Sequence, residues 1–300
     1  MDAIIDFFTN PYYTQVMTMM GVYLIAALGL NLITGVTGQF SFGHAAFMSI
    51  GAYSSALLSK NIDTPFILSL LVGGLTAALF GVIIAFPSMR LTGDYLGITT
   101  LGFGEIVRVV FINMEITGGA RGLAGIPKHT DLTIVVVFVV LFVWALYRIN
   151  NSRLGRALVA IREDEIAAEC MGISTLYYKV QSFAIGTFMA GVSGGLYAHL
   201  LQYLNPSDFG FAKSFEILNY VVIGGLGSIP GTILGTSLLS LAPEFLRFVK
   251  EYRMLIYGAL MVLMMIFRPH GILGGVDLGK AVKRLWNRRK PPAALSGGSN

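Results

Sequence analysis

The side chains that could do chemistry in this sequence are few, and several of them lie next to long apolar stretches. Asn31, Gln39, Ser41 and His44 surround a glycine-rich interruption of the first apolar run. They would either line a polar route for a small solute or satisfy the backbone groups that the interruption frees. No nucleophile or carboxylate is placed by sequence to work with His44, so the pattern favours passage of a solute over catalysis.

A second polar group consists of Glu105 and Arg108, three residues apart in another apolar run. Residues at this spacing meet on one face of a helix and can form an ion pair. Ionisable side chains within a membrane are costly, which makes them functional candidates. The alternative is a pair that only joins helices, with Arg108 reaching water. We count Glu105, Arg108 and the preceding Thr100 as candidates for a translocation path.

The elements that hold these residues are predicted to be transmembrane helices. Only 12% of the 300 residues are charged, against about 25% in soluble proteins. The uncharged runs 65–87, 180–207 and 217–243 are each long enough for a membrane core, which needs about 20 residues. They do not alternate apolar and polar residues, which excludes an outer-membrane barrel. The expected fold is therefore all-α and polytopic.

The apolar runs and turn residues predict nine crossings, within a range of about eight to ten. The second and seventh segments are rich in small residues and would also fit re-entrant segments. The basic cluster at 280–290 follows the last apolar run, which favours a cytoplasmic C-terminus and an outer N-terminus. We expect one permease domain over 1–275 and a basic tail over 276–300 with a disordered end. The predicted spans are 16–34, 40–58, 65–87, 95–112, 131–148, 180–204, 214–229, 231–249 and 253–268.

Two glycine-rich segments are predicted to break these helices. Glycine permits positive φ and proline ends a helix, so the chain can turn at either segment. Paired glycine-broken helices are typical of transporters built from structural repeats, in which the substrate path lies at the breaks. The residues of the two breaks are Gly35, Gly38, Gly224, Gly225, Gly227, Pro230 and Gly231.

The long polar interruption at 150–179 contains a predicted amphipathic helix over 152–169. Leu154, Leu158, Ile161 and Ala168 share one face at helical spacing. Such a helix could lie among lipid headgroups, but anionic lipids would repel its acidic end. A surface of mixed charge with small residues is better suited to docking another protein.

This segment resembles the coupling loop of ABC importer permeases, with Glu165, Ala167, Ala168 and Gly172 fitting the loose signature after one inserted residue. Residues 152–165 with 172–173 more specifically resemble the branched-chain amino acid permease family of the LivM type. Further similar segments are 29–47, 93–106, 117–123, 224–231 and 267–271, so the resemblance covers nearly the whole chain.

The resemblance implies an inner-membrane subunit that imports leucine, isoleucine and valine by alternating access. Its expected partners are a homologous second permease, two ATP-hydrolysing subunits, a periplasmic or lipid-anchored binding protein, and membrane lipid. The chain contains no Gly-x-x-x-x-Gly-Lys-[Ser/Thr] loop. ATP and Mg²⁺ are therefore expected on the partners, and this chain is not expected to be an enzyme. The residues expected to couple it to the ATPases are Gly155, Arg156, Ile161, Arg162, Glu163, Asp164, Glu165, Ala167, Ala168 and Gly172.

Other assignments stay open at this point. Related permeases carry urea, short amides or aromatic acids, and a stand-alone secondary transporter or channel would share the apolar helices. The net charge of +5 is concentrated at the membrane flanks, which does not favour nucleic acid. Cys170 is the one cysteine and the four histidines are scattered, so no metal site is predicted.

Overall fold

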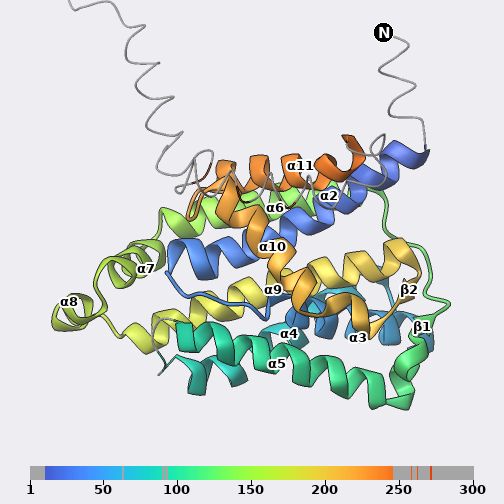
Figure 1. The fold of residues 1–300 in the computed structure, drawn as a ribbon, viewed down its shortest axis with the longest axis horizontal. Helices are drawn as coiled ribbons and strands as arrows, with labels where there is room; N and C mark the ends of the chain where they lie inside the picture. Colours follow the sequence, from blue (N-terminus) through green and yellow to red (C-terminus); the bar gives the residue numbers. More distant parts are fainter. Residues whose placement is uncertain are drawn as a thin grey trace, which may run out of the picture.

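The computed structural model describes residues 11–62, 64–89, 91, 94–245, 258, 262 and 271, and in this part the chain is a bundle of long helices (Figure 1). The strands β1 (Leu123–Ala124) and β2 (Tyr203–Leu204) pair antiparallel. The long helices confirm the all-α expectation. They are α2 (Pro11–Leu30) with the π-helix η1 (Asn31–Val36), α3 (His44–Ile62), α4 (Phe66–Ser88), α5 (Asp94–Asn113), α6 (Leu132–Asn150), α7 (Arg153–Glu163), α8 (Glu165–Cys170), α9 (Thr175–Leu201), α10 (Phe211–Gly224) and α11 (Ile229–Phe245). Short 3-10 turns are η2 (Glu115–Thr117), η3 (Gly119–Arg121) and η4 (Pro206–Phe209).

Helix α9 is the centre of the bundle, packed against α2, α3 and α4. Its glycines allow the backbones to approach closely. A Cβ added to Gly186 would lie 2.6 Å from the carbonyl oxygen of Gly29, and one added to Gly191 would lie 2.7 Å from that of Gly73. Small residues serve this purpose in membrane helices, where van der Waals packing drives association.

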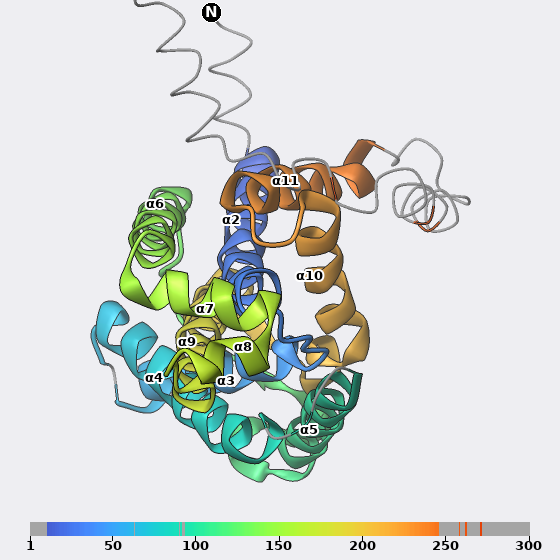
Figure 2. The same cartoon turned by 90° about the vertical axis from the view of Figure 1, so that its left-hand side faces the viewer.

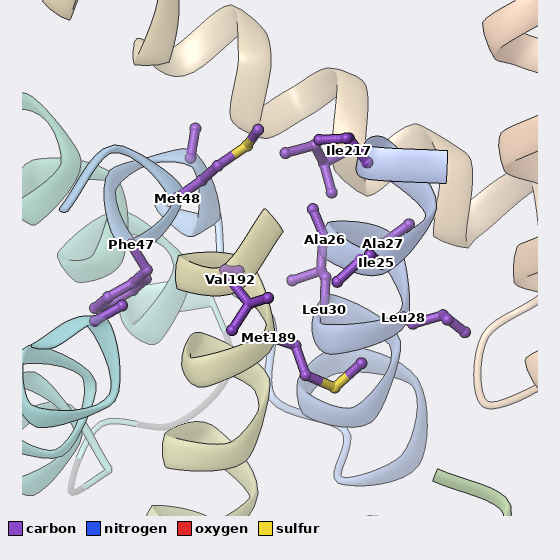
Figure 3. Packing of buried hydrophobic residues seen from close by; sticks show 14 of the residues in the cluster. Ile25, Ala26, Ala27, Leu28, Leu30, Phe47, Met48, Met189, Val192 and Ile217 are labelled. Atoms are coloured by element: carbon purple, nitrogen blue, oxygen red, sulfur yellow. The ribbon is translucent and has the colours of Figure 1, made fainter. Parts of the chain in front are cut away.

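The core is formed by apolar side chains from α2, α3, α9 and α10. Figure 3 shows labelled core side chains from each of these helices, among them Leu30, Met48, Met189 and Ile217. The outer helices differ, because α6 buries only three of its side chains and exposes large apolar ones such as Trp144. An apolar exterior around an apolar core is the distribution expected of a protein surrounded by lipid.

Five described helical segments are long and apolar enough to cross a membrane: Pro11–Val36, Phe66–Ser88, Tyr95–Asn113, Leu132–Asn150 and Thr175–Leu201. They correspond to the first, third, fourth, fifth and sixth predicted spans. At 14 residues, α10 falls short of the about 20 residues that a complete crossing needs. The predicted span 253–268 and the tail 276–300 lie outside the described residues, so the total of eight to ten spans stays a prediction.

The predicted helix 40–58 begins later than expected, because residues 37–43 are not helical. Gly38 has φ +78°, which turns the chain out of the helix. Side chains then bind the freed backbone groups: the Thr34 hydroxyl donates to the Gln39 carbonyl at 3.0 Å, and the Phe42 N–H donates to the Thr100 hydroxyl at 3.0 Å. The chain becomes helical again only at His44.

The predicted single helix 152–169 is instead two helices, α7 and α8. Asp164 between them is extended, with φ −157° and ψ 111°. Its carboxylate accepts the N–H of Ala167 at 3.0 Å, which makes it the N-cap of α8. The amphipathic pattern predicted helical structure correctly but did not show that Asp164 divides it.

We expect Gly194→Ala to lower the melting temperature of the purified subunit in detergent. An added Cβ would lie 2.8 Å from the carbonyl carbon of Met48, and overpacking of this kind costs about 1–3 kcal/mol. Gly102→Ala is the matched control, because a Cβ at Gly102 meets nothing within 4 Å. Equal melting temperatures for the two variants would contradict the close packing of α9 against α3.

Candidate functional site

Three segments that are far apart in the sequence meet at one end of the bundle, which faces the viewer in Figure 2. They are η1, the turn between α10 and α11, and the end of α7. The guanidinium of Arg162 donates from Nη1 to the Gly35 carbonyl at 3.0 Å. The N–H of Gly227 donates to Asn31 Oδ1 at 2.8 Å. We call Asn31, Gly35, Arg162 and Gly227 the junction.

The junction depends on glycine because there is no room for side chains. A Cβ on Gly35 would lie 2.9 Å from the Cα of Gly227, and one on Gly38 would lie 2.8 Å from Cγ of Arg162. Gly227 also has φ +79°, a conformation that favours glycine. The two predicted breaks are thus in direct contact with each other and with the predicted coupling segment.

The other residues of the second break shape the turn itself. Gly225 has φ +117°, and Pro230 lies in the first turn of α11, where its missing N–H costs nothing. A Cβ on Gly231 would lie 3.0 Å from the carbonyl carbon of Gly224, so the end of α10 and the first turn of α11 pack closely. The participation of these residues in transport stays a prediction.

Helices α7 and α8 extend from the junction at the end of the bundle away from β1 and β2 (Figure 1). Two contacts attach α8 to α9: Lys179 forms an ion pair with Glu165, and the Thr175 hydroxyl donates to Glu169 at 2.6 Å. The buried side chain of Ile161 holds α7 against the bundle. Glu165 and Ile161 therefore anchor the predicted coupling segment.

Three further members of the predicted coupling set control local geometry. Gly155 lets α7 pack on the end of α6, since a Cβ there would lie 2.5 Å from the Asn150 carbonyl oxygen. The guanidinium of Arg156 donates to the Asn151 carbonyl at 3.2 Å. Gly172 has φ +82° and closes the end of α8.

The outer face of α8 and the residue that follows it expose large apolar side chains. Ile166 is 77% exposed and Met171 is 82% exposed, and Ala167 beside them is exposed as well, whereas Ala168 is buried at 4%. Glu163 is also exposed and pairs with Arg162 at 2.6 Å. Apolar side chains so exposed at the end of a bundle are suited to a protein partner. Sequence analysis missed Ile166 and Met171, although both are apolar residues within a charged segment.

The polar residues predicted to line a path divide into two groups. Asn31 and Thr100 accept backbone N–H groups, and His44 Nε2 donates to the Ala26 carbonyl at 3.0 Å. Such contacts fit the alternative interpretation, in which these polar side chains form hydrogen bonds with the backbone groups that the helix break leaves without partners. The Gln39 amide and the Ser41 hydroxyl are buried and have no hydrogen-bond partner among the described residues. A path-lining role is untested for all five.

The predicted ion pair on α5 is present, with Arg108 Nη2 2.7 Å from Glu105 Oε2. This ion pair is far from the junction residues in the sequence. Its Arg108 side chain lies beside Gly210, the residue before α10. A second ion pair of the same spacing was missed by sequence analysis. Lys213 Nζ lies 2.7 Å from Glu216 Oε2 within α10. The sequence does indicate this pair, because its two residues are the charged ones in an otherwise uncharged run.

A comparison with protein families decides the assignment. The family described as the branched-chain amino acid transport system permease component matches residues 12–265. The chain belongs to this family. With five long apolar helices among its described residues, this permease is a multi-pass membrane protein.

Individual relatives agree with the LivM type. LivM of Escherichia coli K12 is 40% identical over 294 residues, covering 86% of this permease and 69% of the relative. LivH of the same strain is 27% identical, and the match covers 90% of this permease and 98% of LivH. BraD of Pseudomonas aeruginosa is 27% identical, and the match covers 88% of this permease and 95% of BraD. All three are named as permeases for branched-chain amino acids, which does not favour urea, short amides or aromatic acids.

Removal of the Asn31 amide should loosen the turn between α10 and α11. In Asn31→Ala the Gly227 N–H loses its acceptor, a loss on the order of 1 kcal/mol. Hydrogen exchange followed by mass spectrometry should then be faster over residues 225–228. Asn113→Ala removes an asparagine bonded only within α5 and serves as the control. Unchanged exchange at 225–228 in the Asn31 variant would argue against the junction.

Proposed function

We propose that this protein is the permease subunit of an ATP-driven importer for leucine, isoleucine and valine. The observation that carries the transport part is the junction, in which one arginine of a surface helix contacts the first helix break, and this break contacts the second. The substrate class is supported by the relatives, which are named for branched-chain amino acid transport.

The proposed assembly contains a second permease, two ABC ATPases and a periplasmic or lipid-anchored binding protein. Support for a permease pair comes from LivM and LivH, two permeases of one organism that are both similar to this chain. ATP and Mg²⁺ would bind to the ATPases, whose contact surface here is the exposed face of α8. This subunit would provide the path for the amino acid and the conformational change that moves it, and would catalyse no reaction.

The proposed orientation places α7 and α8 in the cytoplasm and β1 and β2 outside, in the cytoplasmic membrane of a bacterium. The N-terminus would then be outside and the C-terminus cytoplasmic. Arg153, Arg156 and Arg162 lie at the α7 end, and cytoplasmic segments are rich in such residues.

Coupling would proceed through the contacts that hold α7 and α8. Closure of the ATPases displaces α8, and the ion pair from Glu165 to Lys179 transmits that displacement to α9. Arg162 transmits it to Gly35, which lies in the π-helical segment that follows α2. Because Gly35 packs on Gly227, the α10–α11 turn must move with α2. The result is a change in the angle between α2 and the α10–α11 pair, which is the kind of two-state movement that alternating access needs.

We expect Ala167→Trp to uncouple transport from ATP hydrolysis. The residue is exposed on α8, so a bulky side chain disturbs docking without disturbing the fold. In proteoliposomes with all partner subunits, leucine uptake should fall about tenfold, a loss of about 1.4 kcal/mol in coupling, while the protein is made in normal amounts.

Two variants serve as controls. Ala167→Ser should behave as wild type, and Ala168→Trp should instead lower the yield of folded protein, because Ala168 is buried. Normal uptake and normal leucine-stimulated ATP turnover in Ala167→Trp would exclude α8 as the docking surface.

The substrate class is tested by ATP hydrolysis in the same proteoliposomes. Leucine, isoleucine and valine should each stimulate turnover, and urea should not. Stimulation by urea alone would move the protein to the group of permeases for short amides.

A further inference from the structure

A cavity of about 330 Å³ lies between α2, α10 and α11, next to the Lys213–Glu216 pair. Its wall includes Gln15, Met19, Met20, Glu216, Tyr220 and Leu239. Small-molecule sites measure about 300–1,000 Å³, and this cavity is at the small end of that range. Its size is sufficient for a ligand as large as an amino acid.

The charged wall of the cavity is held by a set of specific contacts. Lys213 Nζ donates to Tyr23 at 3.0 Å and lies 4.4 Å from the centre of its ring. The Tyr220 hydroxyl donates to the second oxygen of Glu216. Lys213 and Glu216 are the only charged residues between 209 and 243. Charges in such surroundings are costly and default to a functional role.

A purely structural role would be to join α10 to α2 through Tyr23. That role explains the contacts of Lys213 and Glu216 with each other and with Tyr220, but not why the Glu216 side chain also lines a cavity. The opposite walls are apolar, with two methionines and a leucine. Methionine adapts its shape, which suits a wall that receives leucine, isoleucine and valine in turn.

We propose that this cavity binds a zwitterionic amino acid with an apolar side chain within the permease itself. The ligand's ammonium group would lie at Glu216, its carboxylate at the donors of Gln15 and Ser240, and its side chain against Met19, Met20 and Leu239. The neutral Lys213–Glu216 pair favours a ligand without net charge over an anion or a cation. This inference rests on the proposed function and adds a substrate site to it.

The position of the cavity fits a site on the way to the junction. Tyr23, the last α2 residue in its wall, precedes Asn31 by eight residues, or about 12 Å along a helix. The rest of the α2 wall extends from there toward Tyr12, away from α7 and α8 (Figure 1). The cavity is therefore in the half of the bundle that the proposed orientation places toward the outside.

The test measures binding of tritiated leucine to the purified permease pair without the binding protein. Met19→Trp fills the cavity and leaves the ion pair intact, and we expect it to weaken leucine binding about tenfold or more. Met17→Trp is the matched control on the same helix, because Met17 does not line the cavity. Its leucine affinity should equal that of the wild type.

A second variant tests the charged wall. The double substitution Lys213→Met with Glu216→Leu removes both charges together, so that neither is left unpaired. Its leucine affinity should also fall about tenfold or more. Melting temperatures close to the wild-type value would show that either loss is one of binding. Two further ligands test the zwitterion: isoamylamine lacks the carboxylate, 4-methylpentanoate lacks the ammonium group, and neither should displace leucine.

The possible outcomes separate this site from the proposed function. If the complete wild-type assembly takes up no branched-chain amino acid, the proposed function fails. If it takes up leucine but the permease pair binds none, or if Met19→Trp and the double variant bind it like wild type, the cavity is not a substrate site. Displacement of leucine by the amine or the acid would overturn its recognition as a zwitterion.

Discussion

The structure depends on one constraint: in apolar surroundings, every backbone N–H and C=O that leaves a helix needs another partner. The stretch from η1 to α3 leaves the helix for seven residues, and side chains from three segments provide those partners. Thr34 and Thr37 act from the same stretch, Thr100 from α5, and Ser214 from α10, whose hydroxyl accepts the Ala45 N–H at 3.1 Å. The break is consequently held by helices on both sides.

The same constraint explains why the break can transmit movement. A helix end that is bound by Asn31 to a second break and by Arg162 to a surface helix cannot shift without shifting both. A continuous α2 would satisfy its own backbone and would bind to neither. The π-helical turn at Asn31–Val36 is therefore the feature that connects the interior of the bundle to α7 and α8, and π-helical turns are frequent at functional sites.

The distribution of apolar residues along the sequence predicted those helices that are determined by the length of an apolar run. Predicted spans such as 65–87 and 95–112 match α4 and α5 within a residue or two, because apolar length alone defines a crossing. The split at Asp164 depends on a capping contact, and the late start of α3 depends on Thr100, which is 58 residues from its partner Phe42. Contacts at such separation leave no periodic trace in one sequence.

The candidate site shows the same division. Glycine and proline content identified both breaks, and the mixed charges of 153–169 identified the surface helices, but only the fold shows that these parts meet. Lys213 and Glu216 repeat the spacing of Glu105 and Arg108, but spacing alone does not show what surrounds an ion pair. Their significance comes from the cavity beside Glu216, which three helices form together.

Helices α2, α10 and α11 each take part in both regions. One end of each helix lies at or next to the junction, and the cavity is formed by residues nearer the other end. A change in the angle between α2 and the α10–α11 pair at the junction must therefore change the separation of Met19 from Leu239 in the cavity wall. Binding of an apolar side chain between these walls would in turn favour one angle over the other. Affinity for the substrate and the position of α8 are then coupled through the same three helices, and this coupling acts in both directions because linkage is reciprocal.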